Sequence, residues 1–487
     1  MRRPVFDPQD VTGNILYATV QNGAGSGPGL GSDTRGTVLK STDRGETWTD
    51  CGLQVEVKPN KDQDITDRLA VDPLNSNVIW LTTRAHGTWR STAAGAPGSW
   101  SQVAGINQTL GGRFIKFDIS AGTVSGVTKN MFIGTTGGMY QSTDGGATFT
   151  QMVGGPTSLL RASIAKDGVM FVTTYSATAN GVWKWSGGSW STVSPDPARI
   201  YKSVMVNPDN SNEVIAASSG SWSAELMWRS TTGGNLGSWS LMSHTRDKTE
   251  APHSEMSTGA GNIGFSIDMI AFDPFNAGHV WFSDMINVSQ TTNVWAPTVA
   301  WKLRVTGLEE IFVTGQMVAP RVGRALLNTA TGDVGGFDHT SLTEPPARGM
   351  SSYIATSSSI NITAVDIQAS DPNFIVRFGS DGWNGPPIGA YSTNGGVSYT
   401  RITTYPTANA RGRVAVSATS RNFVWAPQGG PSYWSNTLGA TWTVCNGLPG
   451  GIVPAGDIYS IYAGQVPIAA DRVSGNIFML IPAVPFM

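Results

Sequence analysis

The sequence predicts an all-β protein made of β-propeller blades, and three features of the chain support this prediction. First, its 487 residues include 59 glycines and only 14% charged residues, a composition typical of short strands joined by tight turns. Second, two sequence repeats alternate along the chain, which indicates a repeated structural unit. Third, no helical periodicity of any length accompanies these repeats.

The first repeat predicts pairs of antiparallel strands. It consists of an apolar strand ending in Asp-Pro or a related pair, a polar turn, an Asn or Gly, and a second apolar strand. Its copies are VFDPQDVTGNILYATV, LAVDPLNSNVIWLTT, VMVNPDNSNEVIAAS, IAFDPFNAGHVWFSD and IAADRVSGNIFML. Two apolar runs flanking a short turn are typical of a hairpin.

The second repeat has the form Ser-x-Asp-x-Gly-x-Thr-Trp and predicts a hairpin turn of the Asp-box type. It is cleanest at residues 41–48 and 142–149, and worn copies begin at Ser392 and Ser435. Looser copies end at Trp100 and Trp239. We expect Asp43 and Asp144 to bond turn amides and the closing aromatic to pack under the turn, so these aspartates are structural rather than catalytic.

Strand pairs spaced by about 45 to 65 residues, each closed by such a hairpin, are typical of four-stranded propeller blades. The spacing gives roughly seven blades by residue 345, where SLTEPPARGMSS interrupts the pattern. We therefore expect an N-terminal propeller over residues 1–345, with an incomplete first blade, and the start of a second propeller over residues 346–487. About three blades in the second region are fewer than a closed propeller needs, so we expect a truncated chain.

Composition excludes several functional classes. A net charge of −2, with Lys and Arg scattered singly, favours neither nucleic acid nor an anionic membrane as a partner. No apolar run is long enough to span a bilayer, and MRRPVFDPQD is not a signal peptide. Cys51 and Cys445 are expected to be free, buried thiols. The five histidines lack metal-ligand spacing, so we expect neither a metal nor a cofactor.

Several long segments resemble glycoside hydrolase family 74, and they occur in the same order along nearly the whole chain. They are RLAVDPLNSNVIWLTTRAHGTWRST, GFSIDMIAFDPFNAGHVWF, GLEEIFVTGQMVAPRVGRALLNTATGDVGGFDH and AVDIQASDPNFIVRFG. The resemblance implies two seven-bladed propellers facing an open cleft, and an enzyme that cleaves xyloglucan-type β-1,4-glucan with inversion. Inverting glycosidases use two carboxyl groups about 6.5–9.5 Å apart.

The resemblance also implies that Asp366 is the general acid, because it falls where the family has an aspartate before Tyr-Ala. The match is imperfect, since Ile367 and Gln368 replace Tyr-Ala and Asp371 replaces the asparagine before Pro372. The family's catalytic base lies in a Thr-Asp-x-Gly-Gly turn of its first blade, to which nothing in this sequence corresponds. Without the resemblance, Asp366 is as consistent with a turn or strand-end role as with catalysis.

Other candidates lie in the matched segments. Asp268 and Asp333 are the acidic residues expected to reach a bound sugar, while Asp67, Glu309 and Glu310 are expected to line or brace the central face. Tryptophans outside the Asp boxes can stack on sugar rings, and Trp222 and Trp383 are the candidates, with core packing as the alternative for both. By contrast, the tryptophans within strands are expected in the core: Trp80, Trp281 and Trp425.

Together these features predict an extracellular, monomeric polysaccharide hydrolase without a cofactor, in which endo and exo cleavage remain equally open. Two alternatives come from other classes. One is a non-catalytic Asp-box propeller that binds carbohydrate or protein, as in sortilin-like receptors, although two cysteines do not fit the cysteine-rich module of those receptors. The other is a sialidase, which needs an arginine triad and a tyrosine nucleophile.

Overall fold

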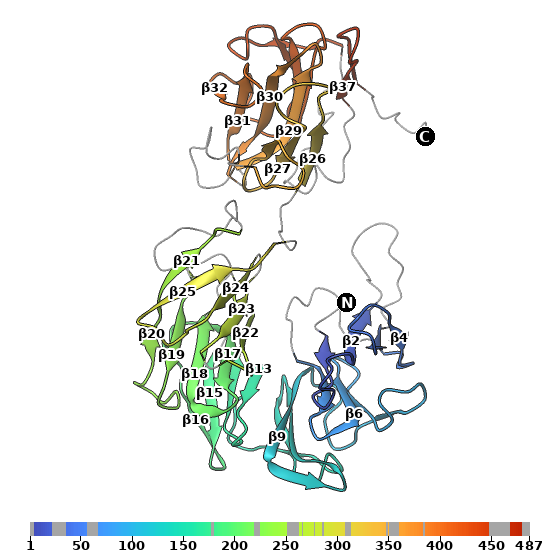
Figure 1. The fold of residues 1–487 in the computed structure, drawn as a ribbon, viewed down its shortest axis with the longest axis vertical. Helices are drawn as coiled ribbons and strands as arrows, with labels where there is room; N and C mark the ends of the chain where they lie inside the picture. The colour runs from blue at the N-terminus through green and yellow to red at the C-terminus, as the bar shows by residue number, and fades with distance from the viewer. Residues whose placement is uncertain are drawn as a thin grey trace. The chain divides into compact units, whose positions relative to one another are not determined.

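The computed structural model describes most of the chain, and every element assigned in the described part is a β-strand (Figure 1). The all-β prediction is therefore confirmed. None of these residues forms a helix that is long and apolar enough to cross a membrane. The described residues are 4–21, 36–55, 67–176, 180–218, 225–250, 263–264, 266–276, 278–284, 287–306, 313–346, 349, 360–382, 385–447 and 468–479.

The strands form ten sheets, which we number in chain order, and the first six contain β1 to β25. Sheet 1 contains β1 (Val5–Phe6), β2 (Leu16–Gln21), β3 (Gly36–Ser41) and β4 (Thr49–Asp50). Sheet 2 contains β5 (Leu69–Asp72), β6 (Asn75–Thr82), β7 (Thr88–Ser91) and β8 (Trp100–Gln102). Sheet 3 contains β9 (Gly112–Val124), β10 (Val127–Thr135), β11 (Gly138–Ser142) and β12 (Thr150–Gln151).

Sheet 4 contains β13 (Leu159–Ile164), β14 (Met170–Thr174), β15 (Gly181–Ser186) and β16 (Ser189–Thr192). Sheet 5 contains β17 (Tyr201–Asn207), β18 (Asn210–Ser218), β19 (Met227–Ser230) and β20 (Ser240–Leu241). Sheet 6 contains β21 (Ser243–Asp247), β22 (Met269–Phe272), β23 (Val280–Ser283), β24 (Val288–Thr291) and β25 (Thr298–Leu303).

The remaining four sheets contain β26 to β38. Sheet 7 contains β26 (Val313–Val318), β27 (Leu327–Thr331) and β28 (Phe337–His339). Sheet 8 contains β29 (Ile360–Gln368), β30 (Asp371–Asp381), β31 (Pro387–Ser392) and β32 (Thr400–Ile402). Sheet 9 contains β33 (Arg413–Val416), β34 (Phe423–Ala426), β35 (Tyr433–Ser435) and β36 (Thr443–Val444). Sheet 10 contains β37 (Ile468–Ala470) and β38 (Ile477–Met479).

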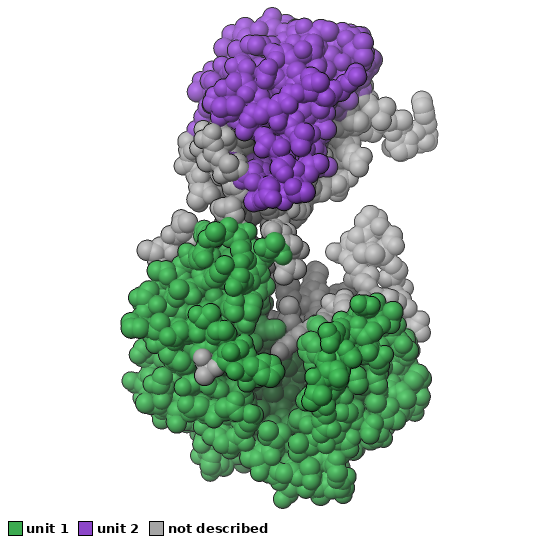
Figure 2. Space-filling model, in the orientation of Figure 1, with its two compact units in different colours: residues 1–250, 256–306 green, residues 251–255, 307–487 purple. Residues whose placement is uncertain are grey.

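Seven of the sheets are four-stranded antiparallel meanders, the form of a propeller blade. Each copy of the first repeat supplies an antiparallel strand pair, as predicted; this pair is the first two strands of its sheet except in sheet 6, where it is β22 and β23 and the earlier β21 pairs in parallel with β25 at the other edge. The first strand of each sheet contacts the first strand of the next, from β1 to β22 and again from β26 to β37. These strands are therefore the inner ones, the first six sheets follow one another along a curve (Figure 1), and Figure 2 shows a hollow between their described atoms. Sheet 1 has four strands, although the sequence predicted an incomplete first blade.

The hydrophobic core is divided into clusters that each fill the space between two neighbouring sheets. Because side chains alternate across a strand, one strand supplies two clusters. In β6, for example, Ile79 and Leu81 pack toward sheet 1, whereas Val78 and Trp80 pack toward sheet 3. The predicted core tryptophans Trp80 and Trp425 are buried, but the prediction was wrong for Trp281, which is partly exposed because its side chain lies on the opposite face of β23 from Val280 and Phe282, which enter the core between sheets 5 and 6.

The Asp-box segments form the turns that the motif predicted. Asp43 accepts hydrogen bonds from the Ser41 hydroxyl at 2.7 Å and the Thr47 amide at 2.9 Å. Asp144 makes the same two bonds to Ser142 and Thr148. Hydrogen bonds from the threonine hydroxyl and amide, and then from the serine, lower the pKa of each aspartate to about 2. Both carboxylates are thereby occupied in turn formation.

The closing tryptophans of these turns connect neighbouring sheets. The indole N–H of Trp100 donates to the carbonyl of Cys51 at 3.1 Å, just past the last strand of sheet 1. Trp239 and Trp442 make the equivalent bond to Val193 and Thr404, at 2.8 and 2.9 Å. We call this contact the indole latch. Where it occurs, the turn that closes one sheet is tied to the end of the sheet before it.

The chain divides into two compact units, residues 1–250 with 256–306 and residues 251–255 with 307–487 (Figure 2). This division lies before the boundary expected at residues 345 and 346. The reason is that sheet 7 shares a core cluster with sheet 8, in which Val318 and Ala330 pack with Ile362. Seven sheets precede residue 345, and their assignment to one propeller stays a prediction.

Cys51 and Cys445 are both free, as predicted. Cys51 is buried in the core between sheets 1 and 2. The expectation that both thiols are buried was wrong for Cys445, which is only partly buried because it follows the short outer strand β36.

Candidate functional site

Asp366 lies on β29, the inner strand of sheet 8, and every residue of this strand is buried. The strand register shows that an aspartate is unusual at this position of an inner strand. Asp366 pairs with Val376 one position before the end of the regular ladder, and the same position holds Ala70 in sheet 2 and Met205 in sheet 5. A carboxyl group thus replaces an apolar side chain on an inner strand. Burying a charge in this way is costly unless it is paired.

Both carboxylate oxygens of Asp366 are paired, and the partners come from the next two sheets. The amide of Val416 on β33 donates to Oδ2 at 2.8 Å. Nη2 of Arg472, in the turn after β37, donates to Oδ1 at 2.7 Å, and Nη1 of the same guanidinium donates to the carbonyl of Ile367 at 3.1 Å. The side chain of Asp366 is 5% exposed and that of Arg472 is 47% exposed. Arg472 is therefore the solvent-facing partner of a buried carboxylate.

Two opposing effects act on the proton affinity of Asp366. Burial raises the pKa of Asp366 above its ordinary value, while Arg472 and the amides of Val416 and Ile367 lower it. Burial is the larger effect, so the net direction is upward. A carboxyl group that keeps its proton to higher pH is suited to protonate a leaving group, which is the task of a general acid.

Asp333 lies at the opposite end of the same inner strand. Its amide donates to Oδ1 of Asn361 at 3.1 Å, and its carbonyl accepts from the amide of Ile360 at 3.1 Å. Five to six residues of extended strand separate this point from Asp366, or about 17 Å at roughly 3.3 Å per residue. Asp333 and Asp366 are therefore too far apart to form the two-carboxylate pair of one inverting site.

The other acidic candidates with described positions lie in the first compact unit. Asp268 precedes β22, is partly buried, and donates its amide to the carbonyl of Ser283 at 3.2 Å. Asp67 forms an ion pair with Lys116 on β9 at 2.6 Å, which ties sheet 2 to sheet 3. Asp67 thus braces neighbouring blades. Glu309, Glu310, Trp222 and Trp383 lie outside the described residues.

Sequence reasoning missed Arg472, although the repeat contains a signal for it. Four copies of the first repeat have proline after the turn Asp or Asn: Pro8, Pro73, Pro208 and Pro274. The copy IAADRVSGN has Arg472 at this position. A long cation in place of a short rigid ring, at a turn next to the inner strands, is a departure that points to a charged partner.

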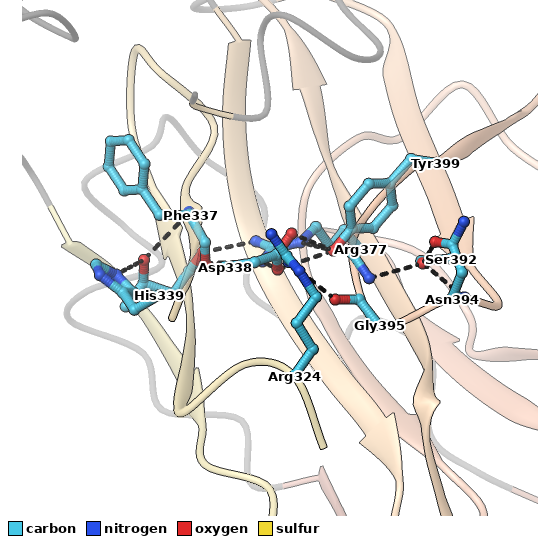
Figure 3. Close-up of polar contacts among 11 residues, drawn as sticks. Arg324, Phe337, Asp338, His339, Arg377, Ser392, Asn394, Gly395 and Tyr399 are labelled. Carbon is cyan, nitrogen blue, oxygen red and sulfur yellow. Dashed lines mark hydrogen bonds and ion pairs between the residues drawn. The ribbon is translucent and has the colours of Figure 1, made fainter. Parts of the chain in front are cut away.

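A second group that the sequence did not reveal is a buried ion cluster between sheets 7 and 8, formed by Asp338, Arg377 and Tyr399 (Figure 3). Nη2 of Arg377 lies 2.6 Å from Oδ1 of Asp338, and its Nε donates to the Tyr399 hydroxyl at 3.2 Å. The Tyr399 hydroxyl donates to Asp338 at 2.9 Å. Arg377 also donates to the carbonyls of Thr329 at 2.6 Å and Phe337 at 3.0 Å.

This cluster has a tyrosine, a carboxylate and an arginine, which are residue types that a sialidase uses. Its arginine and aspartate cannot meet a substrate, however, because the side chain of Arg377 is 0% exposed and that of Asp338 is 6% exposed. Burial raises the pKa of the Tyr399 hydroxyl, which further disfavours a tyrosinate nucleophile. The cluster is therefore structural. Across the described residues, no group of three or more His, Cys, Asp or Glu could hold a metal ion.

No protein-family model matches the chain. A xyloglucanase from Paenibacillus sp is 28% identical over 506 residues, covering 91% of this chain and 47% of that protein. A xyloglucanase from Acetivibrio thermocellus is 27% identical over 515 residues, covering 90% of this chain and 58% of that protein. The chain thus spans about half the length of the curated relatives that it matches.

Two solved structures support the fold. The family 74 xyloglucanase from Xanthomonas campestris has a TM-score of 0.75 and 23% identity, covering 94% of this chain and 67% of that one. The family 74 enzyme from Niastella koreensis has a TM-score of 0.73 and 24% identity, with 97% and 67% coverage. The β-propeller fold and the resemblance to glycoside hydrolase family 74 are thereby confirmed.

Proposed function

We propose that this chain forms part of a glycoside hydrolase that cleaves the β-1,4-glucan backbone of xyloglucan-type polysaccharide with inversion. One observation carries the proposal. Similarity to proteins described as xyloglucanases extends over about 90% of the chain, and Asp366, at the family's acid position, is a buried carboxyl group whose pKa is raised.

In this mechanism the proton of Asp366 passes to the glycosidic oxygen as the bond between that oxygen and the anomeric carbon breaks. A water molecule attacks the same carbon from the opposite face, and a second carboxylate takes up its proton. Asp366 is left ionised, beside Arg472, and regains a proton from solvent. The resemblance assigns the second carboxylate to a Thr-Asp-x-Gly-Gly turn, to which no segment of this sequence corresponds.

The remaining predicted site residues enter the proposal as sugar contacts. Asp268 and Asp333 would accept hydrogen bonds from sugar hydroxyl groups, and Trp222 and Trp383 would stack on the C–H faces of sugar rings. By resemblance we propose a secreted monomer that acts on polysaccharide, without a cofactor and without a nucleic-acid or membrane partner. The domain pair at residues 1–345 and 346–487 belongs to the same proposal.

The test is release of reducing sugar from xyloglucan, compared with carboxymethylcellulose and a sialoside. It is run on this chain and on a form lengthened at both ends toward the size of the relatives. We expect the lengthened form to hydrolyse xyloglucan, and its Asp366→Asn variant to lose about 10²–10⁴-fold in activity, the usual contribution of a general acid. Asp371→Asn is the matched control, since this partly exposed aspartate lies at the turn of the same hairpin and its ionic partner is the exposed Arg421 at 3.4 Å.

A non-catalytic binding propeller is the second candidate, and one observation favours it. The carboxylate of Asp366 is fully occupied by Val416 and Arg472, so it already has a structural role as a tie between three sheets. A folded, lengthened protein that binds xyloglucan but releases no reducing sugar would support this candidate and exclude hydrolysis.

A further inference from the structure

We propose that Arg472 is a positioning residue for Asp366, whose carboxylate it holds in place and covers on the solvent side. The inference deepens the proposed function and rests on it, because it assigns to the proposed acid the residue that orients it. It stands on three features of the structure: a two-point contact, a turn built to present the guanidinium, and a difference in burial between the two partners.

The contact is directional. The guanidinium of Arg472 uses one nitrogen for the Asp366 carboxylate and another for the carbonyl of Ile367, so it grips two consecutive residues of β29. On the other side, the Val416 amide fixes the second carboxylate oxygen. A planar guanidinium bonded at two points sets orientation as well as charge, which a lysine ammonium does less well.

The turn that carries Arg472 is tightly organised. The Asp471 carboxylate accepts hydrogen bonds from the amides of Val473 at 3.0 Å and Ser474 at 3.2 Å, and the Asp471 amide donates to the carbonyl of Asn476 at 2.7 Å. Gly475 adopts a φ of +78°, and a Cβ at this position would lie 2.7 Å from the Ser417 hydroxyl. The backbone next to Arg472 is therefore held against the end of β33.

The charged groups around Asp366 leave Arg472 as its ionic partner. Among the described residues, Arg472 is the charged group that acts on the pKa of Asp366. On β33, Arg413 is directed instead to the carbonyl of Thr363 at 2.7 Å. At the turn between β29 and β30, Arg421 pairs with Asp371. Removing Arg472 therefore leaves Asp366 buried with only amide donors.

The exposure of the Arg472 guanidinium determines what a substrate meets first. Because Arg472 is 47% exposed while Asp366 is 5% exposed, solvent and substrate meet the arginine before the carboxyl group. A substrate that reaches Asp366 must displace or pass this side chain, which frees Oδ1 to carry the proton. Once the proton has been transferred, the returning guanidinium stabilises the carboxylate that remains.

The first experiment is a double-mutant cycle on the chain itself, with Arg472→Gln, Asp366→Asn and the double variant, measured by urea unfolding at pH 8 and pH 4. We expect coupling between the two positions at pH 8 that decreases at pH 4, where the carboxyl group becomes protonated. Arg472→Lys should keep part of the coupling, and it also serves if Arg472→Gln does not fold. Arg421→Gln is the control and should show no coupling to Asp366→Asn.

The second experiment measures the pH dependence of kcat/KM on xyloglucan with the lengthened form of the protein. An opposite charge within a few ångströms lowers an aspartate pKa by about 1–3 units, so its removal should raise the alkaline limit. We expect Arg472→Gln to move this limit upward by about one pH unit, Arg472→Lys by less, and Arg421→Gln not at all.

Absence of coupling at both pH values, or an alkaline limit that does not move, overturns the proposal. Coupling in a protein without hydrolase activity leaves Arg472 as the residue that positions Asp366 and rejects the proposed function instead.

Discussion

Two aspartate–arginine pairs in the second compact unit have nearly the same length but opposite surroundings. Asp338 and Arg377 lie 2.6 Å apart with both side chains buried, and Asp366 and Arg472 lie 2.7 Å apart with the arginine half exposed. In the first pair, Tyr399 and two carbonyls complete the hydrogen bonding of the guanidinium. In the second pair, the guanidinium makes one carbonyl contact and otherwise faces water.

The difference in burial means that the two aspartate–arginine pairs serve different purposes. A pair buried on both sides cannot open without leaving unpaired charge in the core, so it fixes two sheets together. A pair buried on one side can open more easily, because the freed arginine is hydrated and the buried carboxyl group keeps the Val416 amide and can take up a proton. The Asp338 cluster therefore serves the fold, whereas the Asp366 pair has the one-sided exposure that the proposed site requires.

The position of Tyr399 relates the buried Asp338–Arg377 pair to the Asp-box repeat. Tyr399 closes the worn Asp box STNGGVSY, where three other boxes have the tryptophan of an indole latch. Its hydroxyl donates to Asp338, on the last strand of the preceding sheet, and so connects the same two places that the latch connects. At this junction a buried ion cluster replaces a single indole hydrogen bond.

Breaking the buried pair should have the largest effect. Arg377→Gln removes the charge that compensates Asp338, and we expect a loss of about 3–5 kcal/mol in the free energy of unfolding. Urea unfolding measures it. The matched control is Arg421→Gln, because the exposed pair with Asp371 should contribute at most about 1 kcal/mol. Equal losses in the two variants would contradict the contrast between buried and exposed pairs.

Tyr399→Phe sharpens the comparison by keeping the ion pair and deleting only its third member. Asp338 and Arg377 each lose one hydrogen bond in a buried setting, so we expect a loss of about 1–3 kcal/mol in the free energy of unfolding. The measurement is again urea unfolding, with Tyr391→Phe as a control on a neighbouring strand. A change within error would mean that the hydroxyl is not part of the cluster.

Replacing an indole latch tests the ordinary junction. Trp442→Phe and Trp239→Phe keep an aromatic ring but remove the N–H that bonds the previous sheet, and each should cost about 0.5–1.5 kcal/mol. Trp48→Phe is the control, because its indole donates to Gly45 within its own turn. Thermal unfolding monitored by circular dichroism will show whether the ion cluster at Tyr399 stabilises its junction more than a latch does.

The exposed Asp-box carboxylates should show the smallest effect, and only in acid. The pKa of Asp43 and of Asp144 is about 2 in the folded protein, below the ordinary value of 3.8. A lowered folded pKa means that their contribution to stability is present above about pH 4 and is lost as the pH falls through 2. Between these values, Asp43→Asn with Asp144→Asn should flatten the decline of the melting temperature. An unchanged slope would show that other carboxyl groups dominate acid unfolding.

The sequence by itself determined the repeating part of the structure. The Asp-Pro repeat predicts one antiparallel strand pair in each of five sheets, and the Asp boxes predict the turns, because both are local patterns whose hydrogen bonds close within a few residues. Alternation along strands such as β6 also predicts two buried faces, and Trp80 and Trp425 lie in the core as expected. Asp366 was found only through a resemblance, since nothing local distinguishes it from a strand-end aspartate.

Only the tertiary structure shows which charged residues pair with one another across sheets. Arg472 lies 106 positions from Asp366 in the chain, and Asp338 lies 39 positions from Arg377. No local pattern encodes such distances, because the pairing depends on how successive sheets pack around their inner strands. The same packing places sheet 7 in the second compact unit and buries the Asp338 and Arg377 side chains of Figure 3 beyond the reach of a substrate. Burial is a property of neighbours, and neighbours are fixed only when the sheets assemble.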